Sequence, residues 1–185
     1  MNYVELDKFI PREEVVFLKI RLFIFMVITL LILGSSGVAD ANNSVDLKLV
    51  STSDCFVIGE VFEIKLMVVS EEDKVAGVSA FIDFDPSVFS IIDCELGDEL
   101  PVIIGDTPKI DNNKGELDIN LGSWKPYPEG TFEICSLKLR ALRVAEETSL
   151  SFSSQKGGNN CRNSLVAFKG QNILINTEGL TISIQ

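Results

Sequence analysis

The sequence contains no histidine, and this absence removes the commonest means of enzymatic chemistry. Histidine is the usual general acid or base near neutral pH, so neither a Ser-His-Asp nor a Cys-His arrangement exists in this chain. The four cysteines show no CxxC spacing, which disfavours a zinc site when no histidine can complete the ligand set. A glycine-rich phosphate-binding loop is also missing. We therefore predict a protein that is not an enzyme and that holds no metal or other cofactor.

Basic residues are scarce, since 16 Lys and Arg stand against 27 Asp and Glu for a formal net charge of −11. No stretch of the sequence gathers basic residues into a patch. An acidic chain of this kind repels nucleic acid and anionic lipid. The expected partners are therefore neutral or cationic, and nucleic acid is not among them.

Long apolar runs are limited to one segment near the start of the chain. From Leu22 to Leu33 every residue except Thr29 is apolar, with Lys19 and Arg21 before the run and small residues up to Ala41 after it. This order is typical of a secretory signal peptide. These 12 residues would span only about 18 Å as a helix, which is short of the ~30 Å hydrocarbon core of a bilayer.

We predict that residues 1–41 are a signal peptide and that residues 42–185 form one secreted domain, located outside the cell or at its surface. The alternative is an uncleaved N-terminal anchor, because the segment before the apolar run is long and mixed in charge. Only this alternative places the protein at a membrane. The remaining 144 residues carry 12 Lys and Arg against 22 Asp and Glu, a net charge of −10, and are numerous enough to fold unaided.

Apolar residues recur with a period of two, not 3.6, from Val45 to the C-terminus, which indicates half-buried strands. Turn-forming clusters of Asp, Asn, Gly, Pro and Ser separate these strands, and no helix-length amphipathic segment occurs. The stretch after Asp85-Pro86-Ser87 is expected to form no more than a turn. The fold class is therefore all-β, a two-sheet sandwich or a barrel. The alternation is clearest in segments 45–49, 62–68, 78–84, 117–121, 135–141, 150–152 and 180–184.

All four cysteines, Cys55, Cys94, Cys135 and Cys161, lie in the predicted secreted domain. An oxidising compartment permits two disulfides among them in any of three pairings. The alternative is that Cys94 and Cys135, which occupy apolar positions of strand-like segments, are buried free thiols.

Two acidic stretches could suggest chemistry, but a structural role explains each better. Asp83 and Asp85 lie two residues apart and face the same side of a strand, as paired glycosidase carboxylates sometimes do. Asp85 before Pro86 is typical of a turn, and Asp83 fits the solvent face of an alternating strand. The stretch Asp111–Glu116 resembles a calcium loop only superficially, because it lacks the alternating oxygen ligands and the final bidentate Glu. A hairpin turn accounts for it.

The loop Gly122–Pro128 contains two aromatic residues, Trp124 and Tyr127, on either side of Pro126. Planar aromatics in secreted β-sandwiches often stack on sugars, so this loop is an alternative carbohydrate-binding site for a polysaccharide. A binding strip usually needs more than two such residues. We therefore favour packing of Trp124 over one end of the sandwich.

Several segments, in order, resemble cohesin domains. The main one is Val75–Ile92, an alternating strand that ends in Phe-Asp-Pro and continues into an apolar run, with Gly97-Asp98 after it. Ile58–Ile64, Gly130–Leu139 and Ile173–Ile184 resemble the opening, Gly-x-Phe and closing strands of the same family. The resemblance covers essentially the whole of the predicted domain, although no single motif is diagnostic.

The resemblance implies a jelly-roll sandwich of about nine strands, a fold shared with carbohydrate-binding modules. It also implies a dockerin partner, which is a small module that carries its own calcium and takes part in polysaccharide breakdown by secreted enzymes. Known cohesins bind dockerins with one exposed sheet face. The alternatives are carbohydrate binding through Trp124 and Tyr127, or a structural surface or adhesion domain.

The candidate partner-binding residues are those expected to point outward on that sheet face. They are Ser79, Phe81 and Asp83, if the residues between them point inward, and the aligned positions Asn120 and Ser123. Phe81 is the expected anchor, because interface hot spots favour aromatic residues ringed by weaker contacts. The alternative is that a neighbouring loop covers Phe81.

Overall fold

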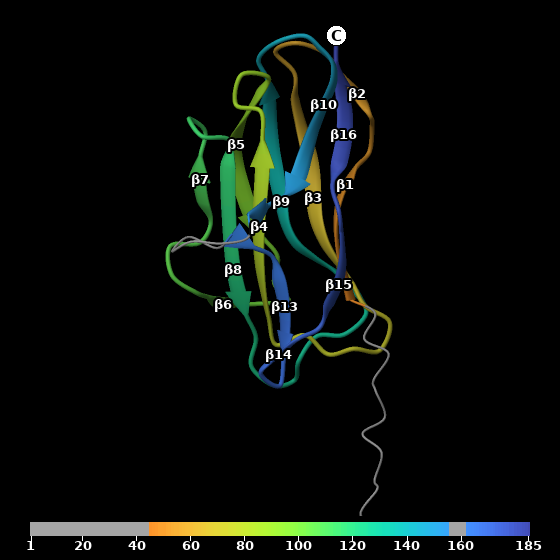
Figure 1. Cartoon of the computed structure of the whole chain (residues 1–185), viewed down its shortest axis with the longest axis vertical. Helices are drawn as coiled ribbons and strands as arrows, with labels where there is room; N and C mark the ends of the chain where they lie inside the picture. Colours follow the sequence, from red (N-terminus) through yellow and green to blue (C-terminus); the bar gives the residue numbers. More distant parts are fainter. Residues whose placement is uncertain (1–44, 156–161) are drawn as a thin grey trace, which may run out of the picture. The chain divides into compact units, whose positions relative to one another are not determined.

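The period-two alternation builds two β-sheets that share one buried core (Figure 1). The computed structural model describes residues 45–155 and 162–185. One sheet has five strands in the order β15-β1-β3-β9-β5, and β1 pairs in parallel with β15 and antiparallel with β3. Its strands are β1 (Val45–Ser51), β3 (Val61–Val69), β5 (Phe89–Leu96), β9 (Thr131–Ala141) and β15 (Leu174–Glu178).

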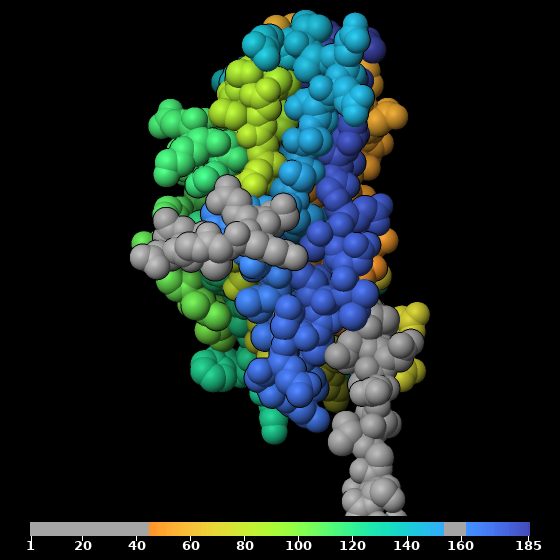
Figure 2. Space-filling model, viewed as in Figure 1, coloured from red at the N-terminus to blue at the C-terminus, as the bar shows by residue number. Residues whose placement is uncertain are grey.

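The second sheet has nine strands, and β4 lies at its centre. Along one edge β4 pairs first with β13 and then with β10, and along the other edge it pairs with β8. Figure 2 shows the outer surface of this sheet, where β10 and β16 lie side by side. The strands are β2 (Cys55–Phe56), β4 (Gly77–Phe84), β6 (Val102–Ile103), β7 (Lys109–Asp111), β8 (Glu116–Gly122), β10 (Ala145–Phe152), β13 (Leu165–Phe168), β14 (Gln171–Asn172) and β16 (Leu180–Ile184).

The predicted all-β jelly-roll sandwich is confirmed, and no helix occurs in the part of the chain that the structure describes. The strand count is higher than the nine expected, because short pieces such as β6 and β7 pair separately with β8. A further two-stranded piece joins β11 (Ser154–Gln155) to β12 (Arg162–Asn163). The stretch after Asp85 is a turn, as predicted, with the amides of Val88 and Phe89 donating to the Asp85 carbonyl.

The core lies between the sheets and contains the inward residues of both. Leu137 and Leu139 of β9 are fully buried, as are Ala80 and Ile82 of β4 and Ile119 of β8. Burying a Leu or Ile side chain contributes roughly 1.5–3 kcal/mol. The inward alternation along each strand is therefore what fixes which side chains remain on the outer face.

The predicted signal peptide, residues 1–41, lies outside the described residues, as does Cys161. Within residues 45–155 and 162–185 no helix is long and apolar enough to cross a membrane.

The remaining cysteines, Cys55, Cys94 and Cys135, are free thiols with different surroundings. Cys55 is exposed, whereas Cys94 and Cys135 lie on the neighbouring strands β5 and β9 and share a hydrogen bond. This bond, together with burial, raises the pKa of the Cys135 thiol well above its ordinary value. The same bond lowers the pKa of the Cys94 thiol despite partial burial.

We expect the reduced, folded protein to be alkylated at Cys55 and Cys94 well before Cys135, because the thiolate is the reactive form and Cys135 is both protonated and buried. Timed iodoacetamide labelling with peptide mass spectrometry measures this order. Labelling in denaturant is the control and should make the three rates similar. Equal rates for Cys55 and Cys135 in the folded protein would contradict the assigned environment.

Candidate partner-binding face

Strand β4 supplies the first half of the candidate site through its alternation. Ser79, Phe81 and Asp83 are half-buried on the outer face of the nine-stranded sheet. The residues between and beside them, Val78, Ala80, Ile82 and Phe84, are buried in the core. The orientation predicted for this strand is therefore confirmed.

Strand β8 supplies the second half, because it lies against β4 along its whole length. Ser79 is opposite Asn120, Phe81 is opposite Asp118, and Asp83 is opposite Glu116. Directly opposed residues on antiparallel strands point to the same face. We define the β4–β8 face by the six residues Ser79, Phe81, Asp83, Glu116, Asp118 and Asn120.

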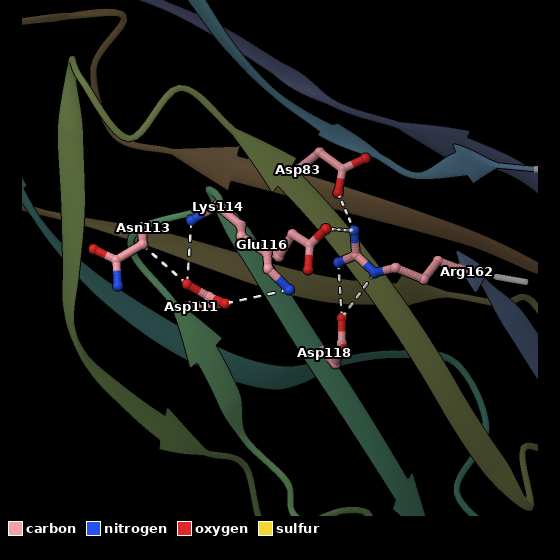
Figure 3. A network of polar contacts seen from close by, with 7 residues as sticks. All are labelled: Asp83, Asp111, Asn113, Lys114, Glu116, Asp118 and Arg162. Carbon is pink, nitrogen blue, oxygen red and sulfur yellow. Dashed lines mark hydrogen bonds and ion pairs between the residues drawn. The ribbon is translucent and has the colours of Figure 1, made fainter. Parts of the chain in front are cut away.

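An arginine from another part of the chain lies on this face. The guanidinium of Arg162, on β12, binds the carboxylates of Asp83, Glu116 and Asp118 (Figure 3). Its Nη2 lies 2.7 Å from Asp118 Oδ1, and its Nη1 bonds to Asp83 and lies 3.4 Å from Glu116 Oε1. Arg162 also lies over Phe81, with Cζ 5.7 Å from the ring centroid.

The charge of this cluster is unbalanced, since three carboxylates surround one guanidinium. The Arg162 side chain is only 12% exposed. Burial lowers the pKa of its guanidinium, but hydrogen bonds to Asp118 and Asp83 outweigh burial, so the net pKa lies above the ordinary value. The guanidinium is therefore permanently charged, and the formal net charge of the cluster is −2, from three carboxylates and one cation.

Phe81 marks the point where β4 changes its partner strand. Its amide donates to Ser164 Oγ at 3.1 Å, and its carbonyl accepts from the Ser153 amide at 2.8 Å. The Phe81 side chain is half-buried, with Arg162 over its ring. Among the described residues, the Arg162 guanidinium covers part of the Phe81 ring.

The other predicted residues lie at the end of the sandwich beyond β8. Ser123 follows β8, and its amide donates to the Ala76 carbonyl while its hydroxyl donates to the Trp124 carbonyl. Trp124 is 75% exposed, so the expectation that it packs over the sandwich is wrong. Tyr127 instead contacts Phe168 edge to face, with ring centroids 5.5 Å apart. Trp124 and Tyr127 therefore have different surroundings, one solvent-exposed and one packed against another ring.

The stretch Asp111–Glu116 forms the turn that was predicted for it (Figure 3). Asp111 Oδ1 accepts from the amides of Asn113 and Lys114 at 3.0 and 3.1 Å, and the Asp111 carbonyl accepts from Gly115 at 2.9 Å. The Asp111 carboxylate is therefore engaged in the turn itself. No group of three or more acidic or cysteine side chains arranged to hold a metal ion occurs among residues 45–155 and 162–185.

Sequence reasoning missed Glu116, Asp118 and Arg162. The two acids were detectable, because they alternate with Leu117, a residue of the predicted strand 117–121. Arg162 gave no such signal, since it reaches Asp83 across 79 positions of the chain.

No family model matches the sequence, and no curated protein sequence matches it. Solved structures do match. A cohesin of Clostridium acetobutylicum superposes with a TM-score of 0.60 at 15% identity, over 78% of this chain and 92% of its own. A type II cohesin from the cellulosome of Acetivibrio cellulolyticus gives 0.59 at 16% identity, over 75% and 95%. A cohesin–dockerin complex from Clostridium thermocellum gives 0.59 at 9% identity, over 77% and 100%.

The domain has the cohesin fold. The structural superpositions establish the fold, whereas identities of 9–16% establish nothing about individual binding residues. The β4–β8 face and its arginine cluster are accordingly described from this chain alone.

Proposed function

We propose that this domain is a non-catalytic protein-binding module of the cohesin type, exported from the cell, which recognises a dockerin-type partner through the β4–β8 face. The observation that carries the proposal is a half-buried aromatic residue, Phe81, at the centre of an outer sheet face in a cohesin fold. The Clostridium thermocellum structure with this fold is described as a complex of a cohesin with a dockerin. Calcium, in this proposal, belongs to the partner.

The charge of the face indicates what such a partner presents. Three carboxylates against one guanidinium favour Lys or Arg on the opposing surface, as charge complementarity guides encounter and register. Ser79 and Asn120 lie opposite each other and provide uncharged hydrogen-bonding groups beside Phe81. The expected interface therefore has an aromatic centre, a polar side and an acidic side.

Phe81→Asp should weaken dockerin binding by about 30-fold or more, because replacing a central aromatic anchor typically costs 2 kcal/mol or more. The experiment is isothermal titration with calcium-loaded dockerins encoded by the source organism, repeated after calcium removal. Calcium removal should abolish binding to the wild-type domain.

Val61→Asp is the matched control, since Val61 is an exposed apolar residue of β3 in the opposite sheet. It introduces the same charge and should leave dockerin binding unchanged. Thermal melting of each variant confirms that the domain is folded. Failure of every source-organism dockerin to bind the wild type, or equal binding by Phe81→Asp, would refute the proposal.

A further inference from the structure

A cleft of about 910 Å³ lies between the β13–β14 turn and the segment that follows β8. Figure 1 shows these two segments at one end of the sandwich. The volume of the cleft falls in the range of small-molecule binding sites. The cleft is lined by Lys74, Lys125, Pro126, Tyr127, Phe168 and Lys169. None of these residues belongs to the β4–β8 face.

Two aromatic rings form an apolar corner in this cleft. Tyr127 and Phe168 are half-buried, with an interplanar angle of 83°, so the rings are two nearly perpendicular walls. Flat apolar walls of this kind accommodate a ring that has an apolar face, such as a pyranose. The Tyr127 hydroxyl adds one polar group at the same place.

Three lysines surround the corner in a chain whose net charge is −11. Lys74 lies 3.9 Å from Glu129, a weak exposed pair. Lys125 and Lys169 make no ion pair with any carboxylate in the described parts of the chain. The Lys169 ammonium lies 5.2 Å from the Phe168 ring centroid, so a cation stands beside an aromatic wall. This basic group could not be recognised from the sequence, because its three lysines lie far apart along the chain.

Lys169 occupies a backbone conformation that lysine rarely adopts. Its φ is +49°, and Gly170 after it has a φ of +78°. With Phe168 paired to Gln171, these two residues form a tight hairpin turn of the kind that favours Asn-Gly. A non-glycine residue pays roughly 1–2 kcal/mol for this conformation, and such strain gathers at functional positions. This turn position therefore holds a lysine, beside the cleft, although asparagine would suit its backbone conformation better.

Hydrogen bonds hold the walls of the cleft together. The Val75 amide, next to Lys74, donates to the Pro128 carbonyl at 2.8 Å. The Ala76 amide donates to the Ala167 carbonyl, next to Phe168, at 2.8 Å. The three segments that supply the lysines are thus fixed relative to one another, which reduces the ordering cost of binding.

We propose that this cleft binds an acidic oligosaccharide, with a pyranose ring against Tyr127 and Phe168 and its carboxylate beside Lys125 and Lys169. An aromatic corner alone would suit a neutral sugar, and lysines alone would suit any anion. The combination selects a ring that carries a carboxylate. This proposal is independent of the partner-binding face.

The test is isothermal titration of the wild-type domain with trigalacturonic acid, with cellotriose as the neutral sugar and hexaglutamate as the acidic peptide. We expect trigalacturonic acid to bind with a Kd on the order of 1 mM or tighter, more weakly as salt is added, and at least about tenfold more tightly than either control. Tyr127→Ala should weaken binding by about tenfold or more, because it removes one wall.

Lys169→Asn separates a binding role from a structural one. Asparagine suits the positive φ, so this variant should keep or raise the melting temperature while binding trigalacturonic acid about threefold or more weakly. Trp124 and Phe81 do not line the cleft. The variants Trp124→Ala and Phe81→Asp should therefore bind trigalacturonic acid as the wild type does. Equal binding of cellotriose or hexaglutamate, no binding of trigalacturonic acid, or an unchanged Kd for Lys169→Asn would each overturn the proposal.

Discussion

Gly115→Ala is expected to destabilise the domain by about 2–5 kcal/mol, the sum of a left-handed backbone penalty and a steric overlap. Gly115 has a φ of +73° in the β7–β8 turn. A Cβ atom there would lie 2.0 Å from the Phe84 carbonyl oxygen and 2.8 Å from Pro86 Cδ. The Phe84 amide donates to the Gly115 carbonyl at 2.8 Å, so the turn cannot move away without breaking this bond. Urea unfolding measures the loss.

Gly105→Ala is the matched control for this substitution. Gly105 also has a positive φ, +68°, but an added Cβ would have no neighbour within 4 Å. Its expected cost is about 1–2 kcal/mol, the backbone penalty alone. If both glycine variants lost the same stability, the overlap with Phe84 would play no part.

The same turn determines how β8 meets β4. Asn112 in the turn exchanges two hydrogen bonds with Ile91 of β5, at 2.8 and 2.9 Å. The turn therefore joins β8, the end of β4 and the opposite sheet. Glu116 and Asp118 follow directly, so the close approach at Gly115 also positions the acidic side of the β4–β8 face.

Arg162→Ala should destabilise the domain by roughly 1–3 kcal/mol, less than for a fully buried ion pair because its partners are partly exposed. The substitution leaves Asp83, Glu116 and Asp118 close together without their cation. It also removes the group that packs over Phe81. Part of the loss should be recovered at high salt, which screens the repulsion among the carboxylates.

Arg140→Ala is the comparison for Arg162, because Arg140 is exposed and has no ion pair among the described residues. It should change stability by no more than about 0.5 kcal/mol. Arg162→Lys should fall between, since lysine keeps the charge but not the planar fork that reaches several carboxylates. Indistinguishable unfolding of Arg162→Ala and Arg140→Ala would contradict a stabilising cluster.

The features that could be predicted from sequence are those that repeat locally. In β4 an inward apolar residue at every second position fixes Ser79, Phe81 and Asp83 on the outer face, and burial in the core enforces that choice. Asn120 was placed on this face by its alignment with cohesin domains, and the pairing of β4 with β8 puts it opposite Ser79. The turn at Asp111–Gly115 also follows from local chemistry, because its carboxylate bonds to backbone amides two and three residues ahead.

The features that could not be predicted depend on contacts between distant segments. Arg162 reaches β4 and β8 from a strand near the C-terminus. Lys125 and Lys169 come together only after β13 and β14 fold beside the segment that follows β8. The exposure of Trp124 depends on the path of a loop, which the alternation of neighbouring strands does not constrain.

The most direct test of the proposed function is an amide NMR titration of the labelled domain with a calcium-loaded dockerin from the source organism. The proposal predicts that the largest shifts fall on β4 and β8, at Ser79, Phe81 and Asn120, while Tyr127 and Phe168 remain unchanged. Shifts confined to the outer surface of the five-stranded sheet, or none at saturating dockerin, would contradict it.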